Sequence, residues 1–123
     1  MLSMLCMACG SDDGGGGSPM TPSGGPGPSG ATITVGSNGT VSPSSVSISV
    51  GQSVTFINND SRSHELASDP HPLHTNCPSI NALGVVGTGQ TKLTNSFGAA
   101  GTCGFHDHND PDNNGLKGTI SIR

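Results

Sequence analysis

The stretch Val46-Ser47-Ile48-Ser49-Val50-Gly51-Gln52-Ser53-Val54-Thr55-Phe56 alternates apolar and polar side chains on both sides of a Gly-Gln turn. Because successive side chains of a strand point to opposite faces, this period of two predicts two strands that each bury one face. The same alternation returns in residues 33–35, 93–97 and 118–122, and no stretch has apolar residues at helical spacing. We therefore predict an all-β domain, a small antiparallel Greek-key β-sandwich of about seven strands.

The chain ahead of this domain has a different composition. Residues 10–30 are mostly Gly, Ser and Pro and cannot bury a core, so we expect a disordered, flexible tether. Residues 1–9 are too short to cross a bilayer, but they resemble the end of a bacterial lipoprotein signal, with Cys9 as the lipidated residue. We therefore expect a folded domain over residues 31–123 that is exported, lipid-anchored to the membrane, and either periplasmic or on the outer surface.

Composition and charge exclude several functions. The chain has 4 Lys and Arg against 8 Asp and Glu, a formal net charge of −4, and no basic stripe that could neutralise the phosphates of a nucleic acid. The residue order of a Ser-His-Asp triad, paired carboxylates and a phosphate-binding glycine loop are also missing, so we do not expect an enzyme. The length fits one small domain, which we expect to be a monomer.

All five histidines lie between residues 64 and 108, in two groups that flank two cysteines: His64, His71, His74, Cys77, Cys103, His106 and His108. Imidazole and thiolate are ligands of copper and zinc, so this grouping predicts a metal site, and we expect one copper ion. If the protein is exported, the two cysteines can instead form a disulfide.

The stretch from 68 to 89 fits no strand, apart from a turn of helix expected near residues 79–83. Long loops in compact domains are usually functional or disordered, and this one carries three of the metal-binding candidates, which favours a function. Asp69, Asp107 and Asp110 are either acceptors for the outer imidazole nitrogens or ordinary turn residues.

Residues 31–123 resemble the cupredoxin family. The resemblance rests on the strand pair in residues 41–60 with His64 shortly after it, on Cys103-Gly104-Phe105-His106, and on Gly115-Leu116-Lys117-Gly118 near the end. It implies a type 1 copper site that lies on the loop before the final strand. His64 and His106 would be its imidazoles and Cys103 its thiolate. The implied function is outer-sphere electron transfer with a redox protein of the cell envelope.

Two departures from that pattern keep a second interpretation open. Leu116 stands where the family commonly has the axial methionine, and His71, His74 and His108 are surplus. Asp69-Pro70-His71-Pro72-Leu73-His74-Thr75 and Phe105-His106-Asp107-His108-Asn109-Asp110-Pro111 resemble a narrower set of cupredoxin-like proteins. This resemblance implies an all-histidine site, drawn from His64, His106 or His108, and His71 or His74, with a Cys77–Cys103 disulfide.

The function would then be redox-silent copper binding, buffering or delivery, with copper donor and acceptor proteins of the envelope as partners. A third interpretation is a domain of the same shape that has lost its metal.

Overall fold

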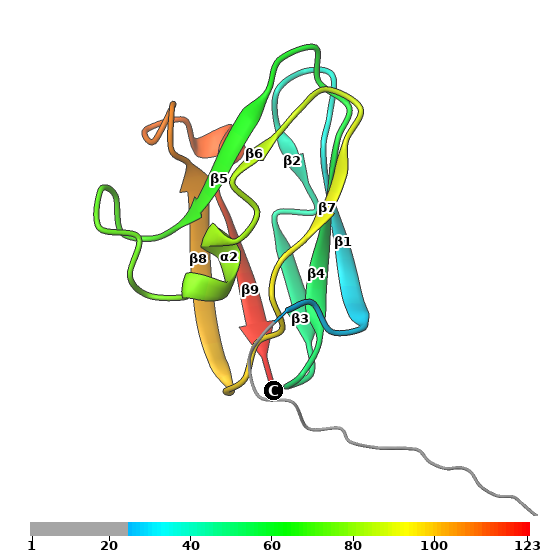
Figure 1. Cartoon of the computed structure of the whole chain (residues 1–123). Helices are drawn as coiled ribbons and strands as arrows, with labels where there is room; N and C mark the ends of the chain where they lie inside the picture. The colour runs from blue at the N-terminus through cyan, green and yellow to red at the C-terminus, as the bar shows by residue number, and fades with distance from the viewer. Residues whose placement is uncertain (1–24) are drawn as a thin grey trace, which may run out of the picture.

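The computed structural model describes residues 25–123, which form two β-sheets packed face to face (Figure 1). The expected lipidation site at Cys9, the segment 1–9 and most of the expected tether lie outside the described residues. Within residues 25–123, no helix is long and apolar enough to cross a membrane.

The described residues contain nine strands. One sheet has the order β2-β1-β4-β7, with β1 at Ser29–Val35, β2 at Val41–Ser42, β4 at Ser53–Asn58 and β7 at Thr91–Leu93. The other has the order β3-β9-β8-β5-β6, with β3 at Ser45–Ile48, β9 at Gly118–Ile122, β8 at Gly101–Asp107, β5 at His64–Ser68 and β6 at Val85–Val86. The all-β sandwich predicted from the alternating stretches is therefore confirmed.

The expectation of purely antiparallel sheets needs correction. The pairs β1–β4 and β3–β9 are parallel and the other neighbours are antiparallel, so both sheets are mixed. Alternation identifies a strand but carries no information about its partner or direction. The count also exceeds about seven, because β2 and β6 have two residues each and are too short to show any alternation.

The core lies between the sheets and depends on two phenylalanines. Phe56 on β4 and Phe105 on β8 are fully buried, and their rings meet edge to face with centroids 5.3 Å apart. Edge-to-face pairs are a preferred aromatic geometry, and this one joins the two sheets. The contact also fixes the position of β8, the strand that carries His106 and ends just before His108.

Two short helical turns lie outside the sheets. α2 at Pro78–Asn81 matches the turn expected near residues 79–83, and its buried Ile80 attaches the long excursion to the core. The 3₁₀ turn η3 at Asn114–Leu116 precedes β9 and buries Leu116 completely. Proline at the start of α2 suits a helix, because its missing N–H is not needed in the first turn.

Candidate metal centre

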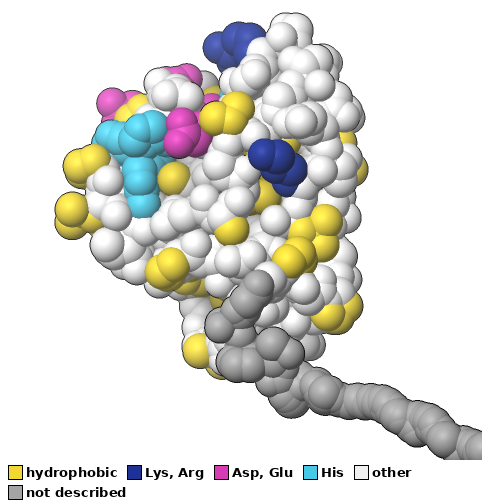
Figure 2. All heavy atoms as spheres, in the orientation of Figure 1, with side chains coloured by type: hydrophobic (Ala, Val, Ile, Leu, Met, Phe, Trp, Pro, Cys, Tyr) yellow, Lys and Arg dark blue, Asp and Glu magenta, His cyan; other side chains and the backbone are white. Residues whose placement is uncertain are grey.

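Three histidines converge at one end of the sandwich. His71 and His74 come from the loop after β5, His106 comes from β8, and one ring nitrogen of each lies within 4.8 Å of the others. The ring of His108 joins them, with its centroid 5.1 Å from that of His71 and 4.9 Å from that of His74. Figure 2 shows the exposed histidine atoms as one patch beside several carboxylates. These four residues are called the histidine cluster below.

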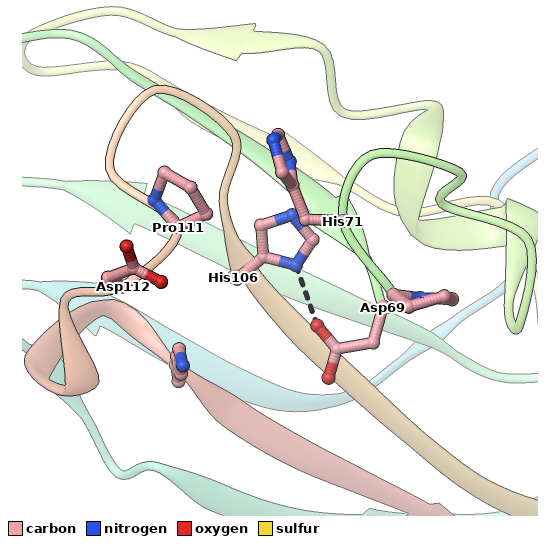
Figure 3. A pocket seen from close by; sticks show the side chains of 7 residues that line it. Asp69, His71, His106, Pro111 and Asp112 are labelled. Atoms are coloured by element: carbon pink, nitrogen blue, oxygen red, sulfur yellow. Dashed lines mark hydrogen bonds and ion pairs between the residues drawn. The ribbon is translucent and has the colours of Figure 1, made fainter.

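His106 is set up as a metal ligand. Its Nδ1–H donates to Asp69 Oδ1 at 2.6 Å, which leaves the lone pair on Nε2. Nε2 is buried and has no hydrogen-bond partner within the described residues. Buried polar atoms are nearly always paired, and a carboxylate on the outer nitrogen is the usual support of a metal-binding imidazole. The chemistry of this atom therefore fits a metal ion (Figure 3).

The carboxylate of Asp69 fits against β8 because residue 104 is glycine. A Cβ at Gly104 would collide with Asp69 Oδ2. Gly104 and His106 are two residues apart on the strand, so they lie on the same face, and the absent side chain makes room for the acceptor of the neighbouring imidazole.

The loop that carries His71 and His74 is held by hydrogen bonds at both ends. The N–H of Asp69 donates to the carbonyl of Gly104 at 3.1 Å, and the N–H of Asn76 donates to the carbonyl of Asp69 at 3.0 Å. His74 adopts φ 55°, the left-handed region, and its carbonyl accepts from Asn81 Nδ2 at 2.8 Å. Non-glycine residues rarely adopt this region and are enriched there at functional sites. The loop therefore presents its imidazoles in a defined arrangement.

The spacing of the nitrogens matches that of metal ligands. His74 Nε2 lies 3.3 Å from His71 Nδ1 and 3.3 Å from His108 Nδ1. Two nitrogens bound at about 2.0 Å to one tetrahedral ion are about 3.3 Å apart. Burial lowers the pKa of His74, and the neighbouring charges of His106, His108 and His71 act in the same direction. A lowered pKa favours the neutral imidazole that binds metal.

His64, the expected upstream ligand, lies apart from the histidine cluster. Its Nδ1 is 2.6 Å from Asp107 Oδ2 and its Nε2 is 2.7 Å from Asp60 Oδ2, and the ring is buried. A carboxylate only accepts, so both ring nitrogens donate and no lone pair is left for a metal. His64 is therefore held between two carboxylates, with both ring nitrogens engaged in hydrogen bonds.

Strand parity explains why His64 and His106 are separated. Leu66 on β5 faces Asp107 on β8, and Ala67 faces His106. His64 is two residues from Leu66, so it shares the inner face with Asp107, whereas His106 is on the outer face. The candidate metal centre is therefore on the outside of this sheet.

The hydrogen bond from His64 also sets the charge state of Asp60. It lowers the pKa of that carboxyl, and the N–H of Ser61 and the charge of Arg62 add to the effect, while burial opposes it. Asp60 is not among the residues predicted for the site. Its signal in the sequence is a carboxylate four residues before a histidine.

The structure pairs Cys77 and Cys103 in a disulfide with a Cα–Cα distance of 5.9 Å. In this arrangement Cys103 has no thiolate, and the type 1 ligand set implied by the resemblance is not assembled. The expected place on a loop also differs, because Cys103-Gly104-Phe105-His106 lies within β8. Residues three apart on a strand point to opposite faces, so Cys103 enters the core while His106 reaches the outer surface.

The other residues singled out from the sequence are also placed. Leu116 is buried in the core, 0% exposed, and is not part of the histidine cluster. Asp69 and Asp107 each accept a hydrogen bond from an imidazole, as the first interpretation of the aspartates predicted. Asp110 accepts from Asn113 Nδ2 and is a turn residue, as the second predicted.

Comparison with known proteins identifies the fold. The domain matches a novel purple cupredoxin from Nitrosopumilus maritimus with a TM-score of 0.56 and 20% identity, over 76% of this chain and 99% of that one. It matches a mutant plastocyanin of fern with a TM-score of 0.60 and 19% identity, over 75% and 99% of the two chains. A Cu(I) form of an amicyanin mutant gives 0.58 and 16%, over 76% and 82%. The fold is cupredoxin-like, as the sequence resemblance implied.

Sequence comparisons add no closer relationship. No family model matches the chain. No curated protein matches it either. The functional argument therefore depends on the residues of the site itself.

Proposed function

We propose that this protein binds one copper ion through His71, His74 and His106, with His108 as the neighbouring fourth imidazole. The observation that carries the proposal is His106 Nε2, a buried nitrogen with no hydrogen-bond partner among the described residues, on a histidine that groups with His71 and His74 at metal-ligand spacing. A histidine that served only packing would satisfy this atom with a hydrogen bond.

Copper is the ion that the donor set favours. Imidazole nitrogens suit copper, zinc and nickel, and among the divalent ions of this series copper binds most strongly. Plastocyanin and amicyanin, whose fold this chain shares, add support, since one of the matching amicyanins is described in its Cu(I) form. When bound, copper supplies one-electron redox chemistry or a Lewis-acid centre.

The role that we favour is copper binding and transfer to protein partners. His71 is exposed and His74 half-buried, and both belong to a loop at the surface. Ligands on a surface loop can pass an ion to a partner by exchanging one bond at a time, whereas a fully enclosed site hinders such exchange. Copper donor and acceptor proteins are the partners that this role requires.

Electron transfer is the second candidate function, and the cupredoxin-like fold is the observation that favours it. Voltammetry of the copper-loaded protein separates the two. A reversible one-electron wave with copper retained in both states supports electron transfer with a redox partner. Loss of copper on reduction supports binding and delivery.

The proposed location is the cell envelope, through a lipid on Cys9. The Cys77–Cys103 disulfide supports it, since such bonds persist in oxidising compartments. In a bacterial host, Cys9→Ala should move the protein from the membrane fraction to the soluble fraction. Unchanged fractionation would contradict the lipid anchor.

Copper titration of the full-length protein against a competing chelator tests the central proposal. We expect one ion per chain, and a loss of affinity of about a hundredfold or more in His106→Ala, because this change removes the best-supported ligand. His64→Gln is the matched control, since it removes a histidine outside the cluster and should keep most of the affinity. Equal losses in both variants would contradict the assignment.

A further inference from the structure

A hollow opens beside one side of the histidine cluster. Two of the proposed ligands, His71 and His106, line it, whereas His74 and His108 do not. Its volume is ≈ 480 Å³, and Pro70 and Pro111 line its wall. Figure 3 shows Pro111 with His71 and His106 around the hollow. The ring of His108 lies against His74, so the hollow lies on the His71–His106 side of the cluster.

The charged groups around this hollow are of both signs. Asp69 and Asp112 line it together with Lys117. Asp69 Oδ1 already accepts a hydrogen bond from His106 Nδ1, so this oxygen is less available to a ligand in the hollow. Asp112 is exposed at the surface. Lys117 is the only Lys or Arg among the lining residues.

Lys117 differs from the other basic side chains of the described residues. Lys92 donates to the carbonyls of Leu83 and Val85, Arg62 pairs with Asp60, and Arg123 donates to Ser47 Oγ. Within residues 25–123, the ammonium of Lys117 has neither a hydrogen bond nor an ion pair. It is exposed at the border of the hollow, and an unpaired cation attracts anions to that space.

We infer that the hollow is a binding site for a small inorganic anion, which binds the metal of the histidine cluster from the side of the hollow and is favoured by Lys117. This inference rests on the proposed function, because the cluster must hold copper. A site with three or four imidazoles and one accessible side accepts an exogenous ligand, as metal sites with an open position do. The electron carriers that share this fold need no such position for outer-sphere transfer.

Azide is the probe for this inference. Sodium azide is titrated into the full-length protein after loading with one equivalent of Cu(II), and the azide-to-copper charge-transfer band and the EPR spectrum are followed. We expect saturable binding of one azide per copper. Copper binding without any spectral change on adding azide would overturn the inference and leave the proposed function intact, whereas failure to bind copper would remove both.

Exposed copper in many sites binds azide weakly, so charge variants provide the decisive comparison. Lys117→Gln should weaken azide binding by about fivefold, Lys117→Arg should restore most of it, and Asp112→Asn should strengthen it. Arg123→Gln makes the same change in net charge at a residue that does not line the hollow, and it should leave azide affinity unchanged. Equal azide affinity in all four variants would mean ordinary exposed copper and would overturn the role of this hollow.

Discussion

At the scale of single residues, the bond between Asp69 and His106 is the support on which the site depends. Asp69→Ala removes the acceptor at 2.6 Å and allows the imidazole to rotate or change tautomer. We expect copper affinity to fall by about tenfold to a hundredfold, as for other carboxylates behind metal-binding histidines. Competition titration measures this. Asp110→Ala is the control, since its carboxylate accepts from Asn113 in the turn and from no imidazole of the described residues, and an equal loss there would contradict the role of Asp69.

His64 is expected to act on stability rather than on the metal. His64→Ala leaves the buried carboxylates of Asp60 and Asp107 without their shared hydrogen-bond partner, so the free energy of unfolding should fall. Urea unfolding should show a lower midpoint, while the variant, where folded, still binds copper. Loss of copper binding with an unchanged unfolding midpoint would identify His64 as a ligand instead.

At the scale of elements, the disulfide links the end of the histidine loop to β8. It joins residues 26 apart in sequence. Replacing both cysteines, Cys77→Ala with Cys103→Ala, should lower the free energy of unfolding by about 3–4 kcal/mol, because the unfolded chain regains the freedom of that loop. Urea unfolding of the variant and the native protein measures the difference.

The same double variant should weaken copper binding without abolishing it. The loop keeps its hydrogen bond to β8, and the four imidazoles of the cluster are unchanged. Complete loss of binding in a folded variant would show that a cysteine sulfur is required.

The elements also show what can be read from this sequence and what cannot. Alternation located the strands around Ile33, Val54 and Ile120, because each has one buried and one less buried face. It did not locate the strand that carries Cys103 and His106, since both of its faces have buried residues. The family resemblance places the ligand motif on a loop, whereas the structure places it within β8, where strand parity separates Cys103 from His106.

At the scale of the whole molecule, acid should unfold the protein partly through Asp60. Its pKa in the folded protein is lowered from 3.8, so the folded state binds this proton less readily than the unfolded state does. The stabilisation is complete above pH 3.8 and is lost as the pH falls through the lower folded value. Urea midpoints between about pH 2 and pH 6 should decline less steeply in Asp60→Asn; an equally steep decline would contradict this assignment.

The overall architecture and the crowding of histidines at one end could be predicted from the sequence, because both depend on residue type and period. The face of the sheet on which each histidine lies could not be predicted. Whether His64 or His71 joins His106 depends on the pairing register of β5 and β8, and no single strand carries that information.

The visible absorption spectrum of the full-length, non-reduced protein with one equivalent of Cu(II) tests the central claim most directly. An outer-face site of imidazoles alone predicts a weak, broad ligand-field band that disappears in His106→Ala. An intense blue or red band from thiolate-to-copper charge transfer would place Cys103 on the metal and contradict the account. So would the absence of any copper-dependent band.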